Sequence, residues 1–389
     1  MLDADSVMSA KAILRLVRTA RHDPQIGILQ SLVVGLPSTS AFTRLFQFGM
    51  RLGMRSYTLG GAWWQGDCGP YWGHNALLRL RPFIDHAQLP MPKDRDSEIL
   101  SHDQIEAVLM RRSGYHVRVV PEESESFEEN PPNLIEFIRR DLRWCRGNMQ
   151  YWRFLGWPRL KFVSRCQLAL AILMFAGSPG WIGLIALGTL AVAAADAPAD
   201  LIRADAGLAV FALVLTMWFA PKIASVIDTL LRAEARQKFG GAARFAASVA
   251  AETVFFTLLS PIMWLGHTLL LAGLPFGGSS RWAEQMRDDH AVSLSQAVRF
   301  FWPHTAIGVG GIVLLAATHP PAIPYALVLL GGLALAIPLA VVTALPIVGQ
   351  ALLRWGIGRL PEETSPPAIL NALRLPALEA LRQPAGTHR

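Results

Sequence analysis

Apolar residues are distributed unevenly along this chain of 389 residues. In residues 1–163, short apolar runs alternate with charged and polar positions, whereas most of residues 164–350 is apolar. Soluble domains carry charges throughout, while a helix that crosses a membrane needs about 20 consecutive apolar residues. The pattern therefore predicts an α/β head at 1–163, a helical membrane region at 164–350 and a C-terminal tail at 351–389.

Four segments of the membrane region are apolar enough to cross a membrane: 165–195, 206–221, 304–320 and 323–347. The turn-forming run Gly177-Ser178-Pro179-Gly180 is expected to kink the first of them. A further apolar segment, 246–275, is interrupted by Glu252, Pro261 and His267. We expect 246–275 to form a broken helix that lies at the membrane interface instead of a fifth span.

Charged residues in the loops predict the orientation of the spans, because basic loop residues favour the cytoplasmic side. The loop 196–205 is mainly acidic, whereas the stretch 222–244 is rich in lysine and arginine. The first loop is thus expected to face outward and the second inward. With four spans, the head and the tail at 351–389 both lie on the cytoplasmic side.

Composition narrows the class of partner. The net charge is +7, but the basic residues flank apolar spans instead of forming one stripe, so membrane lipid is the expected partner and nucleic acid is not. Cys68, Cys145 and Cys166 match no zinc or redox spacing, which favours reduced thiols on the cytoplasmic side. Residues 1–20 lack the apolar core of a signal peptide, so the spans are expected to direct the chain to the membrane.

An Asp-x-Asp triplet opens the head. The carboxylates of Asp3 and Asp5 are hard oxygen ligands, and at a strand end they suit Mg²⁺ or Mn²⁺ shared with a diphosphate. Most such triplets are nevertheless surface turns or caps. The sequence after the triplet predicts a helix over 7–20 and a strand over 26–34.

A second candidate is the aromatic and polar run Tyr71-Trp72-Gly73-His74-Asn75. Sugars bind to aromatic faces combined with planar hydrogen-bonding groups, so Trp72, His74 and Asn75 are candidates for an acceptor platform. The alternative is a packed loop that closes a sheet, and without other evidence that alternative is favoured.

A third candidate is Ser101-His102-Asp103, which opens a helix predicted over 104–113. Ser101 is the expected N-cap and Asp103 lies in the first turn, where the positive end of the helix keeps a carboxylate ionised. Such a carboxylate suits a general base that takes a proton from an acceptor hydroxyl. The commoner role for an aspartate at this place is to stabilise the helix without any chemistry.

The last candidate in the head is a helix predicted from Asn133 to about Phe154. Its arginines gather on one side, among them Arg139, Arg143, Arg146 and Arg153. Arginine binds phosphate in a bidentate manner, and Trp144 can stack on a sugar or a base. Contact with lipid headgroups is the alternative for these arginines.

Together these motifs carry a family resemblance. In chain order they are Asp3-Ala4-Asp5, Tyr71-Trp72-Gly73-His74-Asn75, Ser101-His102-Asp103, Pro131-Pro132-Asn133-Leu134 and Arg140-Asp141-Leu142-Arg143-Trp144-Cys145. The series resembles the membrane-bound family 2 glycosyltransferases, which are related to cellulose synthase, and among them those that build osmoregulated periplasmic glucans. Gln285-Met286-Arg287-Asp288-Asp289 and Pro361-Glu362-Glu363 resemble the same family, so the similarity covers nearly the whole chain.

The resemblance implies a cytoplasmic GT-A domain in the bacterial inner membrane that uses UDP-glucose and a divalent metal. The product implied is a β-1,2-linked glucan passed through the enzyme's own channel, with a glucan acceptor and periplasmic glucan-processing proteins as further partners. By position, Asp3 and Asp5 match the metal ligands and Asp103 the base. Arg140, Arg143 and Trp144 match the Gln-x-x-Arg-Trp motif, with arginine first, and residues 276–299 match the gating loop.

The family also has N-terminal spans and nucleotide-binding strands before its Asp-x-Asp motif. The resemblance therefore implies a partial GT-A domain at 1–163, which alone is not expected to bind UDP-glucose tightly. Two other functions stay open on the sequence. One is a processive synthase of another β-glucan linkage, and the other is an inactive fragment or a channel half that pairs with a separate head.

Overall fold

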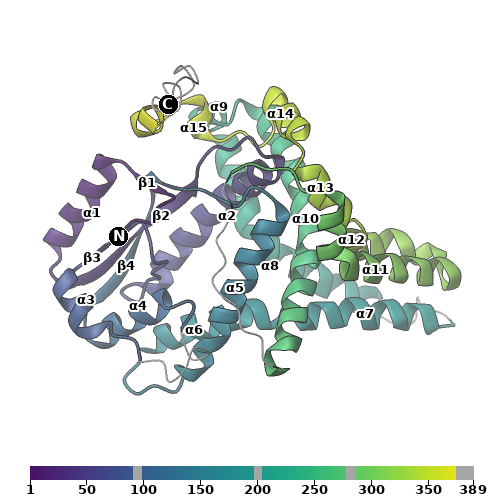
Figure 1. Cartoon of the computed structure of the whole chain (residues 1–389), viewed down its shortest axis with the longest axis horizontal. Coiled ribbons are helices and arrows are strands. Elements are labelled where there is room, and N and C mark those ends of the chain that lie inside the picture. The colour runs from purple at the N-terminus through teal and green to yellow at the C-terminus, as the bar shows by residue number, and fades with distance from the viewer. Residues whose placement is uncertain (91–98, 197–203, 277–285, 287, 374–389) are drawn as a thin grey trace, which may run out of the picture.

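A computed structural model describes residues 1–90, 99–196, 204–276, 286 and 288–373. It has an α/β head from which the helices α7 (Ser178–Ala194), α11 (Leu294–Thr318) and α12 (Ile323–Ala334) extend side by side (Figure 1). The division into a head and a helical membrane region thus follows the hydropathy pattern.

The head is built on a four-stranded sheet with the order β1-β4-β2-β3. Its two long strands, β2 (Ile26–Gly35) and β4 (His116–Glu128), run parallel, while β1 (Ser6–Met8) and β3 (Ala76–Leu78) pair antiparallel at the two edges. Nearly every residue of β2 is buried, as is typical of a strand that is covered on both faces. The strand predicted over 26–34 is therefore confirmed.

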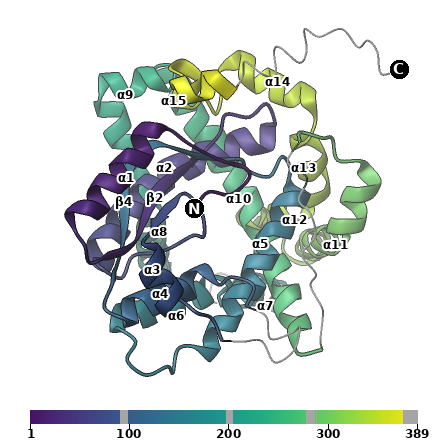
Figure 2. The same ribbon diagram turned by 60° about the vertical axis from the view of Figure 1, so that its left-hand side comes forward.

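Helices cover both faces of this sheet (Figure 2). On one face α1 (Ala10–His22) buries Leu16 and Ala20 against β2, and Ser9 caps its N-terminus. On the other face α4 (Asp103–Arg112) buries Ala107 and Met110 against β2 and β4. Both helices match the predicted ones within three residues at each end. The short helix α3 (Leu80–His86) follows β3.

Two helices join the head to the membrane region. They are α2 (Ala41–Gln65), capped by Ser40, and α5 (Leu134–Met149), capped by Asn133 and followed by the 3-10 turn η2 (Gln150–Arg153). Their phenylalanines form one core with α10 (Ala242–Gly273). Ring centroids lie 5.6 Å apart for Phe42 and Phe137, and 5.4 Å for Phe42 and Phe255. The head is therefore packed onto the membrane helices and is not tethered by a linker.

The expectation of a broken helix at 246–275 is wrong, because α10 is one continuous helix of 32 residues. Pro261 lies inside it and is buried. Neighbouring helices stabilise a proline within a helix of this kind, since they fix the geometry around the missing hydrogen bond. Here α10 packs on α2 at one end, through Phe245 and Phe48 at 5.8 Å, and bonds α5 through His267 and Asp141 further along.

Within the described residues, four helices are long and apolar enough to cross a membrane: Phe162–Ala194, Ala206–Leu231, Ala242–Phe276 and Leu294–Thr318. The first joins α6 (Phe162–Ala176) to α7, and the second lies in α8 (Ala204–Leu231). Three of them correspond to the predicted spans 165–195, 206–221 and 304–320, although the second and third are longer than expected. The remaining one contains the predicted interfacial segment, and by length and composition it also meets the requirement for a span.

The fourth predicted span, 323–347, is not one straight helix. Pro320–Ala334 and α13 (Ala336–Thr343) are bent by 59° where they meet. Close packing fixes α12 beside this bend, because a Cβ on Gly332 would lie 2.4 Å from the carbonyl oxygen of Leu258 in α10. The short segment Pro320–Ala322 (η5) precedes α12.

The glycine face between α11 and α12 gives a test of this packing. A Cβ on Gly308 would lie 2.2 Å from the backbone nitrogen of Ala334, so Gly308→Ala must push the two helices apart. We expect it to lower stability by about 1–3 kcal/mol, measured as thermal unfolding in detergent. Gly310→Ala is the matched control, since nothing lies within 4 Å of its Cβ position. Equal melting temperatures for the two variants would contradict this helix packing.

The C-terminal segment returns to the head and is not a free tail over its described part. The helix α14 (Pro346–Trp355) packs on α2, and α15 (Pro361–Thr364) contacts α9 (Ala233–Lys238). Arg44 pairs with Glu363 at 3.0 Å and Arg51 with Glu362 at 2.9 Å. Residues 374–389 of the predicted tail lie outside the described residues.

Candidate active site

The site is centred on Asp103, the first residue of α4. His102 is the N-cap, without a side-chain cap bond, so the expectation that Ser101 caps this helix is wrong. Ser101 instead faces α5, where a Cβ on Gly147 would lie 2.1 Å from its Oγ.

Three ionisable side chains meet at this turn. His102 Nδ1 lies 3.0 Å from Glu106 Oε1 and 3.4 Å from Asp103 Oδ1, and the three groups offer ligand atoms within 4.8 Å of one another. The hydrogen bond between the His102 ring and the Glu106 carboxylate raises the pKa of His102. Burial raises the pKa of Asp103, Glu106 raises it further, and His102 acts in the opposite direction. Asp103 is therefore a carboxylate with increased proton affinity, as a general base requires.

The loop 71–75 lies directly against Asp103. Gly73 has a φ of +88°, which favours glycine, and a Cβ there would lie 2.6 Å from Asp103 Oδ1. The next residue, His74, lies 3.3 Å from Glu128 Oε2 and 3.5 Å from the hydroxyl of Ser6. His74 also lowers the pKa of Asp103, so its ring faces the same site.

Tyr71 connects this loop to the Asp-x-Asp segment. Its ring is fully buried, and its hydroxyl donates to the carbonyl of Gly73 at 3.2 Å. Burial raises the pKa of Tyr71, and the charges of Glu106, Asp103 and Asp3 raise it further. The charges of Asp3 and Asp103 therefore act on the same buried ring.

The Asp-x-Asp segment runs between the two edge strands of the sheet. Met1 pairs with Ala76 of β3, β1 begins at Ser6, and the carbonyl of Asp5 accepts a bond from the backbone of Glu129 at 3.2 Å. Asp3 is exposed and Asp5 is half-buried. The two carboxylates of this segment provide the hard oxygen donors that Mg²⁺ or Mn²⁺ requires.

The remaining loop residues have different surroundings. Trp72 is half-buried, and its backbone N–H donates to Gln30 Oε1 at 3.0 Å. Asn75 is fully buried, with a φ of +50°, and its amide donates to Ser126 Oγ at 2.7 Å and to the carbonyl of Phe127. Burial therefore excludes Asn75 from contact with a sugar, contrary to the sequence-based expectation, and its role is to hold the loop against β4.

The arginine motif lies on α5. Arg140 is buried, donates to Asn130 Oδ1 at 3.3 Å, and stacks over the Trp144 ring at 4.8 Å. Trp144 is 43% exposed, which leaves part of its ring open to a ligand. Arg143 is half-buried one turn before Gly147, the residue that touches Ser101. The fold thus brings α5 against the turn that carries Asp103.

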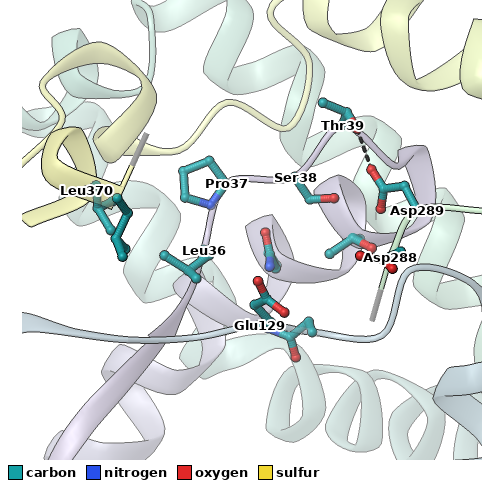
Figure 3. A pocket seen from close by; sticks show the side chains of 12 residues that line it. Leu36, Pro37, Ser38, Thr39, Glu129, Asp288, Asp289 and Leu370 are labelled. Atoms are coloured by element: carbon teal, nitrogen blue, oxygen red, sulfur yellow. Dashed lines mark hydrogen bonds between the residues drawn. The ribbon is translucent and has the colours of Figure 1, made fainter. Parts of the chain in front are cut away.

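A cavity of about 470 Å³ is lined in part by Glu129 and Asn130, the two residues that follow β4. Figure 3 shows its acidic end formed by Glu129, Asp288 and Asp289, and its apolar end formed by Leu36, Pro37 and Leu370. Thr39 Oγ1 bonds Asp289, and Asn133 bonds His290 at 3.0 Å, so this part of the predicted gating loop lies on the head.

Sequence reasoning missed several residues that shape the site. Gly73 and Gly147 permit the close approaches, and Glu106 and Glu128 bond the two histidines. Only Glu106 carried a sequence signal, because it follows His102 by four positions on a helix and must lie on the same face. The other three are brought in by tertiary contacts that no local pattern indicates.

Comparisons with known proteins identify the family of this chain. The family model described as "Glycosyl transferase family group 2" matches residues 1–223. Relatives named "Glucans biosynthesis glucosyltransferase H" come from Xanthomonas campestris pv. campestris (34% identical over 99% of this chain and 62% of the relative) and Caulobacter vibrioides (34% identical over 96% of this chain and 59% of the relative).

A third relative of that name, from Ralstonia nicotianae, is 34% identical over 96% of this chain and 45% of its own length. The chain thus spans about three fifths or less of the curated relatives that it matches. The match to the family model and these identities show that the chain belongs to glycosyl transferase family group 2.

Proposed function

We propose that this chain carries the acceptor side and the membrane helices of a UDP-glucose-dependent glucosyltransferase. Its product would be the β-1,2-linked backbone of osmoregulated periplasmic glucans, exported as it is made. One observation carries the proposal. In a family 2 chain, the Asp103 carboxylate has a raised pKa at the start of α4, among His102, Glu106 and His74. The proposal takes the head as the later part of a GT-A domain.

The proposed reaction is a single inverting displacement. The acceptor hydroxyl gives its proton to Asp103 while its oxygen attacks the anomeric carbon of glucose, and the bond from that carbon to UDP breaks. Arg143 stabilises the charge on the leaving diphosphate, and the exposed face of Trp144 stacks on the acceptor sugar. Trp72 and His74 complete the acceptor side beside Gly73.

Asp3 and Asp5 would hold the divalent metal. When bound, that metal would offset the negative charge that develops on the diphosphate. The cluster of His102, Asp103 and Glu106 also offers three ligand atoms within 4.8 Å. We assign the metal to Asp3 and Asp5, because a metal on Asp103 would occupy the lone pairs that a base needs.

Contacts with the head support a topology in which α10 lies along the membrane surface. Asp289 bonds Thr39 and Glu363 pairs with Arg44, so the chain is on the head side both before α11 and after α13. An even number of crossings must then precede Asp289, and Phe162–Ala194 and Ala206–Leu231 supply two. Helix α11 and the bent pair add two more. The head and the C-terminal segment would both face the cytoplasm of a bacterial inner membrane.

The pKa of Asp103 predicts a pH dependence of polymerisation. Burial raises this pKa and Glu106 adds to the effect, so the deprotonated base is lost at a higher pH than for an ordinary aspartate. The acid limb of kcat/KM should therefore lie above the usual aspartate range. Glu106→Gln removes a negative charge and should move that limb to lower pH. An identical acid limb in both proteins would show that Asp103 is not the titrating group.

Incorporation of labelled glucose tests the proposed function. Membranes that contain the chain would be given UDP-glucose, UDP-galactose or UDP-N-acetylglucosamine, with and without Mg²⁺ or Mn²⁺. We expect metal-dependent polymer from UDP-glucose alone, either from the chain by itself or after co-expression with the preceding part of the Xanthomonas relative. Polymer from another donor, or none in either setting, would contradict the proposal.

A further inference from the structure

Three polar side chains, of which two are buried and Asp141 is half-buried, form a hydrogen-bonded chain between α5 and the membrane helices. His267 of α10 is at its centre, with Nδ1 at 2.9 Å from the hydroxyl of Ser178 and Nε2 at 2.5 Å from Asp141 Oδ2. Asp141 belongs to α5, and Ser178 begins α7 where α6 ends. The three residues thus connect the arginine helix of the head to the first membrane-spanning segment and to α10.

The surroundings show that these contacts are built into the packing. Ser178 is 2% exposed and His267 is 7% exposed, and the ring of Phe175 packs edge-on against His267 at 5.0 Å. A Cβ on Gly266 would lie 2.9 Å from Ile138 Cδ1, so the glycine before His267 brings α10 and α5 together. Buried polar groups of this kind fix one arrangement, because any displacement leaves a donor or acceptor without a partner.

The order serine, histidine, aspartate also occurs in hydrolases, but the burial here excludes that chemistry. A nucleophile must be reached by its substrate, and the Ser178 hydroxyl is enclosed by protein. The three groups therefore act on the structure and not on a substrate.

Asp141 lies within the arginine motif. It follows Arg140, which stacks on Trp144, and precedes Arg143 by two positions. Successive residues of a helix move together, so whatever holds Asp141 also sets the positions of Arg143 and Trp144.

We propose that Asp141, His267 and Ser178 are positioning residues, which hold the arginine helix at a fixed place relative to α7 and α10. For its role in catalysis this inference rests on the proposed function, because it takes Arg143 and Trp144 as the groups that meet the diphosphate and the acceptor. Through this chain of contacts, movement of the first membrane-spanning segment would shift the substrate-binding helix directly.

Cys145 offers a reporter that does not depend on turnover. It is the next residue after Trp144, it is fully buried, and burial together with the Asp141 charge raises the pKa of its thiol to about 12. A thiol reagent can reach it only when α5 moves away from its neighbours. Its labelling rate therefore measures how firmly α5 is held.

The experiment uses the chain with Cys68→Ser and Cys166→Ser as the parent, in detergent, and follows maleimide labelling of Cys145. We expect His267→Ala to label about tenfold faster or more, the loss expected for buried hydrogen bonds, and Ser178→Ala to fall between that variant and the parent. His267→Gln, which can bond one or both partners, should restore much of the slow labelling.

Thr268→Val is the matched control. It changes the neighbouring residue on α10, whose hydroxyl bonds the carbonyl of Trp264 in the same helix, and it should label like the parent. Labelling of His267→Ala at the parent rate, in folded protein, would overturn the proposal.

The activity arm separates positioning from general stability. Where the parent polymerises glucose, His267→Ala should lower kcat about tenfold or more. The control variant Thr268→Val and the parent should have the same melting temperature. Faster labelling with an unchanged kcat would overturn the role in catalysis. A parent without polymerase activity would count against the proposed function, and the labelling rates would still decide whether these residues hold α5.

Discussion

Asp103→Asn should abolish polymerisation while UDP binding stays unchanged. The amide has nearly the same shape as the carboxylate but cannot accept a proton, so the variant loses general-base catalysis, worth about 10²–10⁴-fold in rate. Its neighbours Gly73 and His102 should keep their positions, since an asparagine also fits the space that they leave. Both proteins are co-expressed with the preceding part of the Xanthomonas relative, because this chain alone is not expected to bind UDP-glucose tightly. The rate of glucose incorporation at saturating UDP-glucose, and the affinity for UDP measured by calorimetry, then check the two parts of this expectation.

Asp85→Asn is the control for the loss of one carboxylate. Asp85 is exposed on α3, away from the cluster at Asp103, and its replacement should leave the rate within about twofold of the parent, as for most surface changes. Polymerisation by Asp103→Asn at a rate close to that of Asp85→Asn would show that another group is the base.

Arg51→Met should cause the largest loss of stability. Arg51 is 8% exposed and binds two carboxylates, Glu123 at 2.7 Å and Glu362 at 2.9 Å. Burial acts to lower the pKa of Arg51, but the two carboxylates outweigh it and the pKa is raised. Without the guanidinium, the buried Glu362 carboxylate has no cation beside it. We expect this to lower the free energy of unfolding by about 3–5 kcal/mol. Denaturant unfolding in detergent measures this loss.

Arg15→Met provides the comparison, because Arg15 pairs with Glu122 at the surface and such a pair contributes about 0–1 kcal/mol. Adding Glu362→Gln to Arg51→Met should recover part of the stability, since the unpaired charge is then gone. Equal stability of Arg51→Met and Arg15→Met would mean that the C-terminal segment is not held on α2 by this pair.

Part of the head could be predicted because some signals are local. Asn133 caps the helix that follows it, and the apolar run of β2 marks a strand. The position of Asp103 in the first turn of α4 followed from the same kind of pattern. The long helix α2 and the strand β4 were not predicted, and the grouping of the motifs into one site is an expectation from the family resemblance.

Most features of the fold and of the site that the sequence did not predict depend on contacts between distant segments. The sequence could not show that Gly147 admits Ser101, or that Asn75 is enclosed by β4, because each needs the neighbouring element in place. Proline and polar residues in α10 made a break there look favourable, but packing on α2 and α5 holds the helix continuous. The bend after Ala334 has a local cause instead, because Pro338 in the first turn of α13 has no N–H to donate to the carbonyl of Ala334.

Determining the glycosidic linkage of the polymer tests directly whether the product is the proposed β-1,2-linked glucan. Methylation analysis of glucan made from labelled UDP-glucose, with the anomeric configuration determined by NMR, identifies both the bond and the stereochemistry. From the proposed inverting mechanism with Asp103 as base, we expect 2-linked glucose in the β configuration. A 4-linked or 3-linked product would place the chain among synthases of another glucan, and α-linked glucose would contradict the inverting mechanism.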